Sequence, residues 1–304
     1  MGNKYFSGIF ATLLFAAMAF VSCEKPIIEN GDNGDGEEIV AKGECRITFN
    51  AMRVEQIPFN APSHRAESAQ SLTDVCSRIS FVVFDGDKKV ASVHQASSEN
   101  SFGKVSMNLS KGTYTLVIVA HNGSAAPTFT SPSKISFKDN KVTDTFFYCA
   151  NIDVEDSQQI DVTLKRAVAM FRLVVEDKTP AGVARMKFYY TGGSSTFDAV
   201  NGCGCVDSRQ TEYRDVADAA HEGESSYEVY TFPHSDGRQL KMDVSALGAS
   251  GDNAIYRQVF EDVPVKANQV TQYTGCFFGE DPDGGRSSIT VDIDDEWTQK
   301  NFGY

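Results

Sequence analysis

The sequence is poor in leucine, in tryptophan and in positive charge. Nine Leu stand against 28 Val, and one Trp is present in 304 residues. A chain rich in Val and poor in Leu favours β-strands, and no helical periodicity continues for more than about two turns. We expect one short helix, over residues 209–221. The 28 Lys and Arg against 41 Asp and Glu give a formal charge of −13, which argues against a nucleic-acid surface and against electrostatic docking on an anionic membrane.

The motifs of common catalytic and metal sites are also missing. No two of the five His lie within five residues of each other, and the chain has no H-E-x-x-H, C-x-x-C, G-x-S-x-G or Walker motif. The acidic stretches 280–283 and 292–296 lack the spacing of a calcium-binding loop. The sequence therefore predicts no enzyme, no cofactor and no metal site.

Cysteine is too sparse for a disulfide scaffold. Six Cys follow Cys23, and the one close pair, Cys203 and Cys205, is interpreted as two thiols in a turn. One or two disulfides would be compatible with an extracytoplasmic location, but the pairing stays open. The six residues are Cys45, Cys76, Cys149, Cys203, Cys205 and Cys276.

The N-terminus is typical of a lipoprotein signal peptide. Lys4 precedes a 12-residue apolar run at 9–20, and Ser22-Cys23 follows it. This order resembles a bacterial lipobox, in which Cys23 would be lipidated and would start the mature chain. An ordinary secretory signal cut near Ala17 or Ser22 is the alternative. No later run reaches the ~18 apolar residues of a membrane span, so the lipid would be the membrane attachment.

The mature chain is predicted to divide into a tether and two β-sandwiches. Residues 23–43 are acidic and have little to bury, which is typical of a solvated tether. Short apolar runs separated by turn residues then recur to the end, and this spacing predicts an all-β sandwich fold. A boundary near residue 166 gives sandwiches at 44–165 and 166–304. The first has 12 basic and 13 acidic residues and the second 13 and 22, so the negative charge lies mostly in the second.

Individual strand predictions follow from these runs. The sequence Asp85-Gly86-Asp87 between two β-type runs predicts a hairpin. The expected strands are 45–49, 79–84, 90–93, 105–109, 113–120, 146–149, 160–164, 167–175, 184–191, 227–232, 240–247, 255–260, 270–278 and 289–293.

Several strings, in order along the chain, resemble the FimB/Mfa-like fimbrial subunits of Bacteroidetes. They are RISFVVFDG at 78–86, KGTYTLV at 111–117, LKRAVAMF at 164–171, MKFYYTGG at 186–193, YTFP at 230–233 and VTQYTG at 270–275. The resemblance covers residues 44–278 and agrees with the lipobox and the tether. The segment 286–304 departs from it, and its alternation at 289–293 suits either a strand of its own domain or a donated one.

The resemblance implies two transthyretin-like β-sandwich domains and a role in type V fimbriae. In such fimbriae, stalk subunits are cut after their first strand by an Arg- or Lys-specific protease, and a strand of a neighbouring subunit fills the groove. FimB-like anchors keep the lipid and hold the fimbrium in the outer membrane. The implied partners are other fimbrial subunits, and the implied location is the outer membrane.

Two other functions compete with the anchor. A stalk or tip subunit would be processed after Arg53 or Arg65. Both lie in a polar, Pro-containing stretch that is predicted to be a loop, which a protease can reach. Arg46 is the less suitable site, because it lies inside the first strand. A surface adhesin or glycan-binding module would use aromatic residues. Its candidates are Tyr189, Tyr190, Tyr213 and Tyr227.

Overall fold

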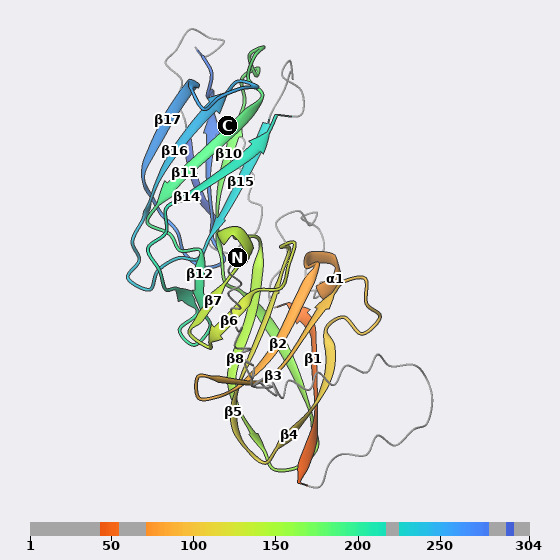
Figure 1. Cartoon of the computed structure of the whole chain (residues 1–304). Helices are drawn as coiled ribbons and strands as arrows, with labels where there is room; N and C mark the ends of the chain where they lie inside the picture. The colour runs from red at the N-terminus through yellow and green to blue at the C-terminus, as the bar shows by residue number, and fades with distance from the viewer. Residues whose placement is uncertain (1–42, 55–70, 217–224, 280–289, 295–304) are drawn as a thin grey trace, which may run out of the picture. The chain divides into compact units, whose positions relative to one another are not determined.

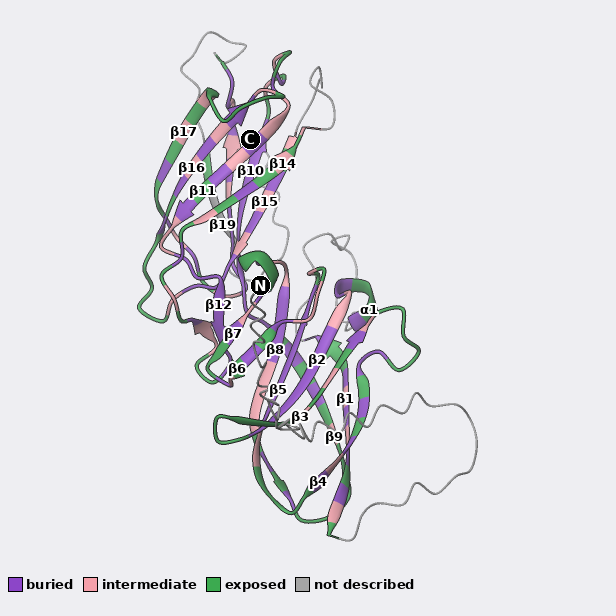
Figure 2. Cartoon of the chain, in the orientation of Figure 1, coloured by how far each residue is buried: buried purple, intermediate pink, exposed green. Residues whose placement is uncertain are grey.

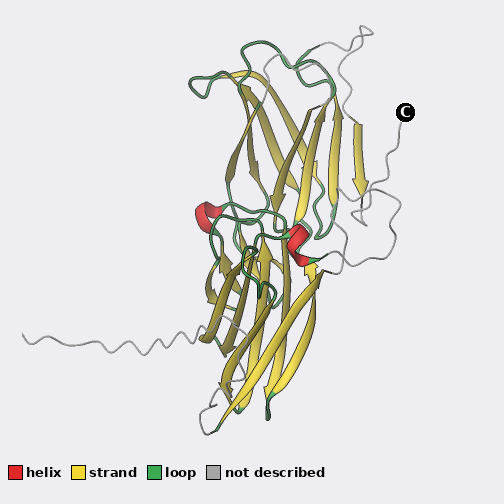
Figure 3. Ribbon diagram, turned by 90° about the vertical axis from the view of Figure 1, so that its right-hand side faces the viewer, coloured by secondary structure: helices red, strands yellow, loops and turns green. Residues whose placement is uncertain are grey.

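The fold is almost entirely β, as predicted from the sequence. The structure is a computed structural model that describes residues 43–54, 71–216, 225–279 and 290–294 (Figure 1). Within these ranges the helices are α1 (Leu72–Val75) and a 3-10 helix, η1 (Lys138–Asn140), both short (Figure 3). No helix in the described ranges is long and apolar enough to cross a membrane.

A seven-stranded sheet, in the order β3-β2-β5-β8-β9-β1-β4, is built from the first half of the chain. β8 and β9 pair only at Phe146–Arg166 and Phe147–Lys165. Beyond this short contact the sheet forms two layers, β3-β2-β5-β8 and β9-β1-β4, whose side chains share one core. The bounds are β1 Glu44–Val54, β2 Arg78–Asp85, β3 Lys88–Ala96, β4 Lys104–Ser110, β5 Gly112–His121, β8 Thr145–Val154 and β9 Gln158–Arg166.

The strand β2 is apolar at successive positions because both of its faces are covered. Ile79, Phe81 and Val83 enter the core between the two layers, whereas Val82 and Phe84 enter a second cluster on the other face. Such two-sided burial explains an unbroken apolar run where a half-exposed strand would alternate. The predicted hairpin is confirmed: β2 and β3 are antiparallel, and Gly86 in the turn has φ of 57°.

That second cluster lies under a small sheet that joins distant parts of the chain. Its order is β13-β12-β7-β6, with β6 Thr128–Ser131, β7 Lys134–Ser136, β12 Thr196–Asp198 and β13 Cys203–Gly204. β12 pairs antiparallel with β7 through Phe197 and Ile135. The ring of Phe197, which is fully buried, lies 4.8 Å from Phe147 and 4.9 Å from Phe232 between ring centroids. None of these four short strands was predicted from the sequence.

Two four-stranded sheets form a second sandwich. One has the order β15-β10-β18-β19 and the other β14-β11-β16-β17, with a shared core of buried side chains between them. β10 runs parallel to β18 and antiparallel to β15. The bounds are β10 Ala169–Val175, β11 Arg185–Thr191, β14 Gln210–Asp215, β15 Ser225–Thr231, β16 Leu240–Leu247, β17 Ala254–Val263, β18 Val270–Gly275 and β19 Thr290–Asp294.

The helix predicted at 209–221 is wrong over its described part. Residues 210–215 form β14, which pairs with β11 along its length. The inward residue of β14 is Glu212, 8% exposed, so the apolar alternation that marks a strand is broken by an acid. Arg214 donates to the Glu212 carboxylate (2.6 Å), and the Tyr190 hydroxyl donates to it as well (3.3 Å). Burial, with the Glu212 carboxylate nearby, raises the pKa of Tyr190, so Tyr190 stays a donor.

A buried arginine links the end of β9 to the turn before β18. Arg166 donates to both carboxylate oxygens of Asp144 (2.7 and 3.0 Å) and to the side-chain oxygen of Asn268 (3.1 Å). Its guanidinium also stacks 4.6 Å from the centroid of Phe146. Asn268 has φ of 63° and donates its backbone N–H to the Val168 carbonyl (2.8 Å). The connection between β9 and β10 is therefore held by charge-assisted hydrogen bonds.

Replacing Phe197 by Ala should destabilise the protein strongly. The change removes a buried ring that contacts two others, and such Phe-to-Ala changes cost about 3–5 kcal/mol of the free energy of unfolding. Denaturant unfolding of the variant and of the wild type measures the loss in the free energy of unfolding. Val200→Ala, in the adjoining turn and 59% exposed, is the control and should change little. Equal stability of the two variants would contradict the packing described for the small sheet.

Candidate strand-exchange site

The first strand lies inside the sheet, not at its edge. β1 pairs antiparallel with β4 from Glu44–Ser110 to Asn50–Lys104, and parallel with β9 on its other side. Both edges of its backbone are therefore hydrogen-bonded. Without β1, the facing edges of β4 and β9 would lose their partners, and an open slot would run between them.

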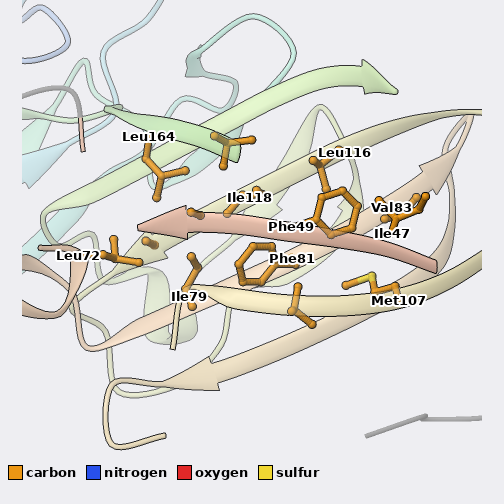
Figure 4. Close-up of a cluster of buried hydrophobic side chains, with 14 of the residues drawn as sticks. Ile47, Phe49, Leu72, Ile79, Phe81, Val83, Met107, Leu116, Ile118 and Leu164 are labelled. Carbon is orange, nitrogen blue, oxygen red and sulfur yellow. The ribbon is translucent and has the colours of Figure 1, made fainter. Parts of the chain in front are cut away.

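Alternating residues of β1 fill the core of the first sandwich. Cys45, Ile47, Phe49 and Ala51 are at most 5% exposed. The ring of Phe49 stacks on Phe81 of the opposite layer, with centroids 6.4 Å apart, and Figure 4 shows Ile47 and Phe49 among the other core side chains. Each fully buried large apolar side chain stabilises the fold by about 1.5–3 kcal/mol. The slot is therefore filled by apolar contacts as well as by backbone hydrogen bonds.

The outward side chains of β1 bond to both neighbouring strands. Thr48 and Ser106 share a hydroxyl–hydroxyl hydrogen bond of 2.9 Å, and Asn50 donates to Asp161 at 3.0 Å. Hydrogen bonds from Asn50 and Gln159 lower the pKa of Asp161, which keeps it an acceptor. These polar pairs fix the register of β1 on its exposed face.

A bulge interrupts the pairing of β1 with β9 between Asn50 and Arg53. Here the Ala51 N–H donates to the Gly103 carbonyl (2.7 Å). Gly103 has φ of 84°, and a Cβ there would lie 2.8 Å from the Met52 sulfur. A glycine is therefore required where β1 meets the loop before β4.

The structure corrects the prediction that Arg53 lies in a loop. β1 extends to Val54, so Arg53 is a strand residue opposite Thr163 of β9, and it also forms a bridge with Ser71. The apolar alternation fades after Phe49, and for this reason the sequence does not predict the extension. Arg46 lies in β1 as expected. Cys23 and Arg65 lie outside the described residues.

The last described strand, β19, belongs to the second sandwich. It pairs antiparallel with β18, from Val270–Asp294 to Thr274–Thr290, at the edge of its sheet. The alternation at 289–293 had left open an own-domain strand or a donated one. In this structure the segment completes its own sheet.

The other candidate residues do not converge on one site. Tyr190 and Tyr227 are buried, whereas Tyr189 and Tyr213 lie on the outer face of the β14-β11-β16-β17 sheet. The Arg185 guanidinium lies 5.0 Å from the centroid of Tyr213. Over the described residues, no group of His, Cys, Asp and Glu could hold a metal ion.

The close cysteine pair lies at the end of the small sheet, at β13 and directly after it. Cys203 and Cys205 are free thiols, and they flank Gly204, whose N–H donates to the Pro233 carbonyl (2.7 Å). Burial, followed by the charge of Asp198, raises the pKa of Cys205, which disfavours the reactive thiolate.

A family model described as "Fimbrillin-A associated anchor proteins Mfa1 and Mfa2" matches residues 37–300. No curated protein sequence matches the chain. Among solved structures, a candidate cell adhesion protein from Bacteroides ovatus is 15% identical, with 85% of this chain and 99% of that chain covered and a TM-score of 0.47. The fimbrial anchor protein Mfa2 from Porphyromonas gingivalis is 10% identical over 82% of this chain and 97% of that one, with a TM-score of 0.46. The tip fimbrial protein Mfa3 from the same organism is 10% identical over 82% and 99%, with a TM-score of 0.40.

The paired position of Arg53 should protect it from proteolysis. A protease binds its substrate as a separate extended segment, which a strand paired on both edges does not offer. During limited digestion of the folded chain with an Arg-specific protease, we expect cleavage after Arg209, which is exposed and outside any strand, well before cleavage after Arg53. Mass spectrometry of a time course gives the order. A fragment starting at Val54 that appears as early as the cut at Arg209 would contradict the described β1.

Proposed function

Because the chain belongs to the family of fimbrillin-A associated anchor proteins, we propose that it is a lipid-anchored outer-membrane subunit that holds a fimbrium to the cell. The lipid would be on Cys23, after removal of residues 1–22, and residues 23–43 would link it to the folded part. Two or more acyl chains on one cysteine would give a stable anchor, since a single chain binds only marginally.

The observation that carries this proposal is the position of β1. A subunit that accepts a strand from a neighbour at this place must first lose its own β1 and open the slot between β4 and β9. In this chain the slot is filled, and the strand contributes five buried residues to the core. A subunit that keeps β1 can end a fimbrium at the membrane but cannot accept a further strand there.

The surroundings of Arg53 support retention of β1. Because Arg53 lies in the paired strand, a processing protease would have to open the ladder before cutting. Processing after Arg65 would be the remaining route to a stalk or tip subunit, and it would separate the lipid and β1 from the rest of the chain.

The adhesin alternative has less support. Two of its four candidate tyrosines, Tyr190 and Tyr227, are core residues, so they cannot contact a ligand. Tyr213 hydrogen-bonds Asp252 (3.4 Å) and is stacked by Arg185. We therefore assign the chain a structural role.

Replacement of Cys23 by Ser should abolish membrane attachment. Without a thiol to acylate, the chain should stay unprocessed or leave the outer-membrane fraction, and fimbriae should be shed into the medium. The exposed thiol variant Cys205→Ser is the matched control and should fractionate as the wild type does. Cell fractionation followed by immunoblotting of this chain and of the fimbriae measures both effects. Outer-membrane retention of Cys23→Ser at the wild-type level would refute the lipid anchor.

A further inference from the structure

An open edge strand exposes unpaired backbone groups, and side-chain hydrogen bonds cover part of one edge of the second sandwich. At one side, Arg214 of β14 donates to the Glu228 carbonyl of β15 (2.7 Å), and the Tyr190 hydroxyl donates to the Tyr230 carbonyl (3.0 Å). These bonds use backbone acceptors of the edge strand β15. In the first sandwich, the edge strand β3 begins with the exposed residues Lys88 and Lys89, a charge pattern that discourages pairing.

The strand β17 is less protected over residues 256–260, where it pairs regularly with β16 between two irregularities in its register. Its ten residues pair, within the described part of the chain, only with β16, and much of its length is exposed (Figure 2). Between residues 255 and 260 it has one charge, Arg257. That guanidinium binds Asp243 of β16 through two hydrogen bonds of 2.9 and 2.6 Å, so its charge is directed over the sheet and away from the open edge.

Exposed or half-buried apolar side chains lie beside this edge on both faces of the sheet, next to Arg257 and Gln258. Ile255 and Val259 are 52% and 40% exposed on the outer face. On the inner face Tyr256 packs against Phe278, with ring centroids 5.3 Å apart. A strand added at the edge would contact both pairs through its alternate side chains.

We propose that the open edge of β17 binds an extended segment of another fimbrial subunit, which adds a fifth strand to the β14-β11-β16-β17 sheet. This inference rests on the proposed fimbrial function and names where a partner attaches. Backbone hydrogen bonds would give affinity, and the apolar neighbours would select a segment that is uncharged in its centre. Asp262, exposed at the end of β17 beside the Glu261–Lys241 ion pair, would favour a basic residue at the facing end of the segment.

A second copy of this chain fits the edge less well. Two antiparallel β17 strands related by a two-fold axis would place Asp262 of each copy near the uncharged start of the other strand, Ala254 and Ile255, so neither carboxylate would meet a base. Each copy also has a formal charge of −13, which opposes self-association. The segment is therefore expected to come from a different subunit.

The substitution Val259→Lys tests the proposal, because it adds a charge to the edge without removing a core contact. We expect fimbrial subunits that co-purify with the chain to fall about tenfold. Val90→Lys is the matched control, because Val90 is 41% exposed and lies on β3, the edge strand that already has two lysines. The amount of fimbrial subunits that co-purify with this variant should equal that of the wild type. The thermal unfolding of both variants should equal that of the wild type. Undiminished co-purification of Val259→Lys would overturn the proposal.

A photo-crosslinking residue at position 259 identifies the bound segment. The expected product joins this chain to another fimbrial subunit, and the crosslinked peptide should be an uncharged, apolar stretch flanked by Lys or Arg. A crosslink to a second copy, to a segment of different chemistry, or to nothing would each overturn the proposal. Failure of the fimbrial function itself is distinguishable, because the wild-type chain would then not co-purify with fimbriae at all.

Discussion

The requirement that every backbone group of a strand find a partner governs the first sandwich. β1 meets this requirement because it is hydrogen-bonded on both sides. It runs parallel to β9 on one side and antiparallel to β4 on the other. Its inward residues supply part of the core, and its outward residues bond to Ser106 and Asp161. Removal of this one strand would leave two unpaired edges and an exposed core.

Contacts between distant segments tie the chain together. β12 and β13 come from the second half of the sequence, yet β12 pairs with β7, β13 pairs with β12, and the small sheet covers the outer face of β2 and β5. Arg166 binds Asp144 and Asn268, which lie 22 and 102 residues away. Backbone pairing, aromatic packing and a buried ion pair all resist separation of these segments.

The sequence predicted the long strands because their cause is local. Apolar runs at 79–84 and 113–120 and the Asp-Gly turn correspond to β2, β5 and the β2–β3 hairpin. The small sheet could not be predicted, since β12 and β13 are only three and two residues long, and β12 depends on β7 for pairing while β13 depends on β12. β14 was misread as a helix because its inward residue is Glu212, and the end of β1 was misread as a loop because Met52 and Arg53 are exposed. At the candidate site, the sequence indicated the first strand but not that it lies between two others.

The account depends on whether this chain keeps its first strand in the cell. Mass spectrometry of the chain purified from outer membranes identifies its N-terminal residue directly. The account predicts one dominant form that begins at acylated Cys23 and continues through β1. A dominant form that begins after Arg53 or Arg65, without an acylated Cys23 peptide, would contradict it and would make the chain a polymerising stalk or tip subunit.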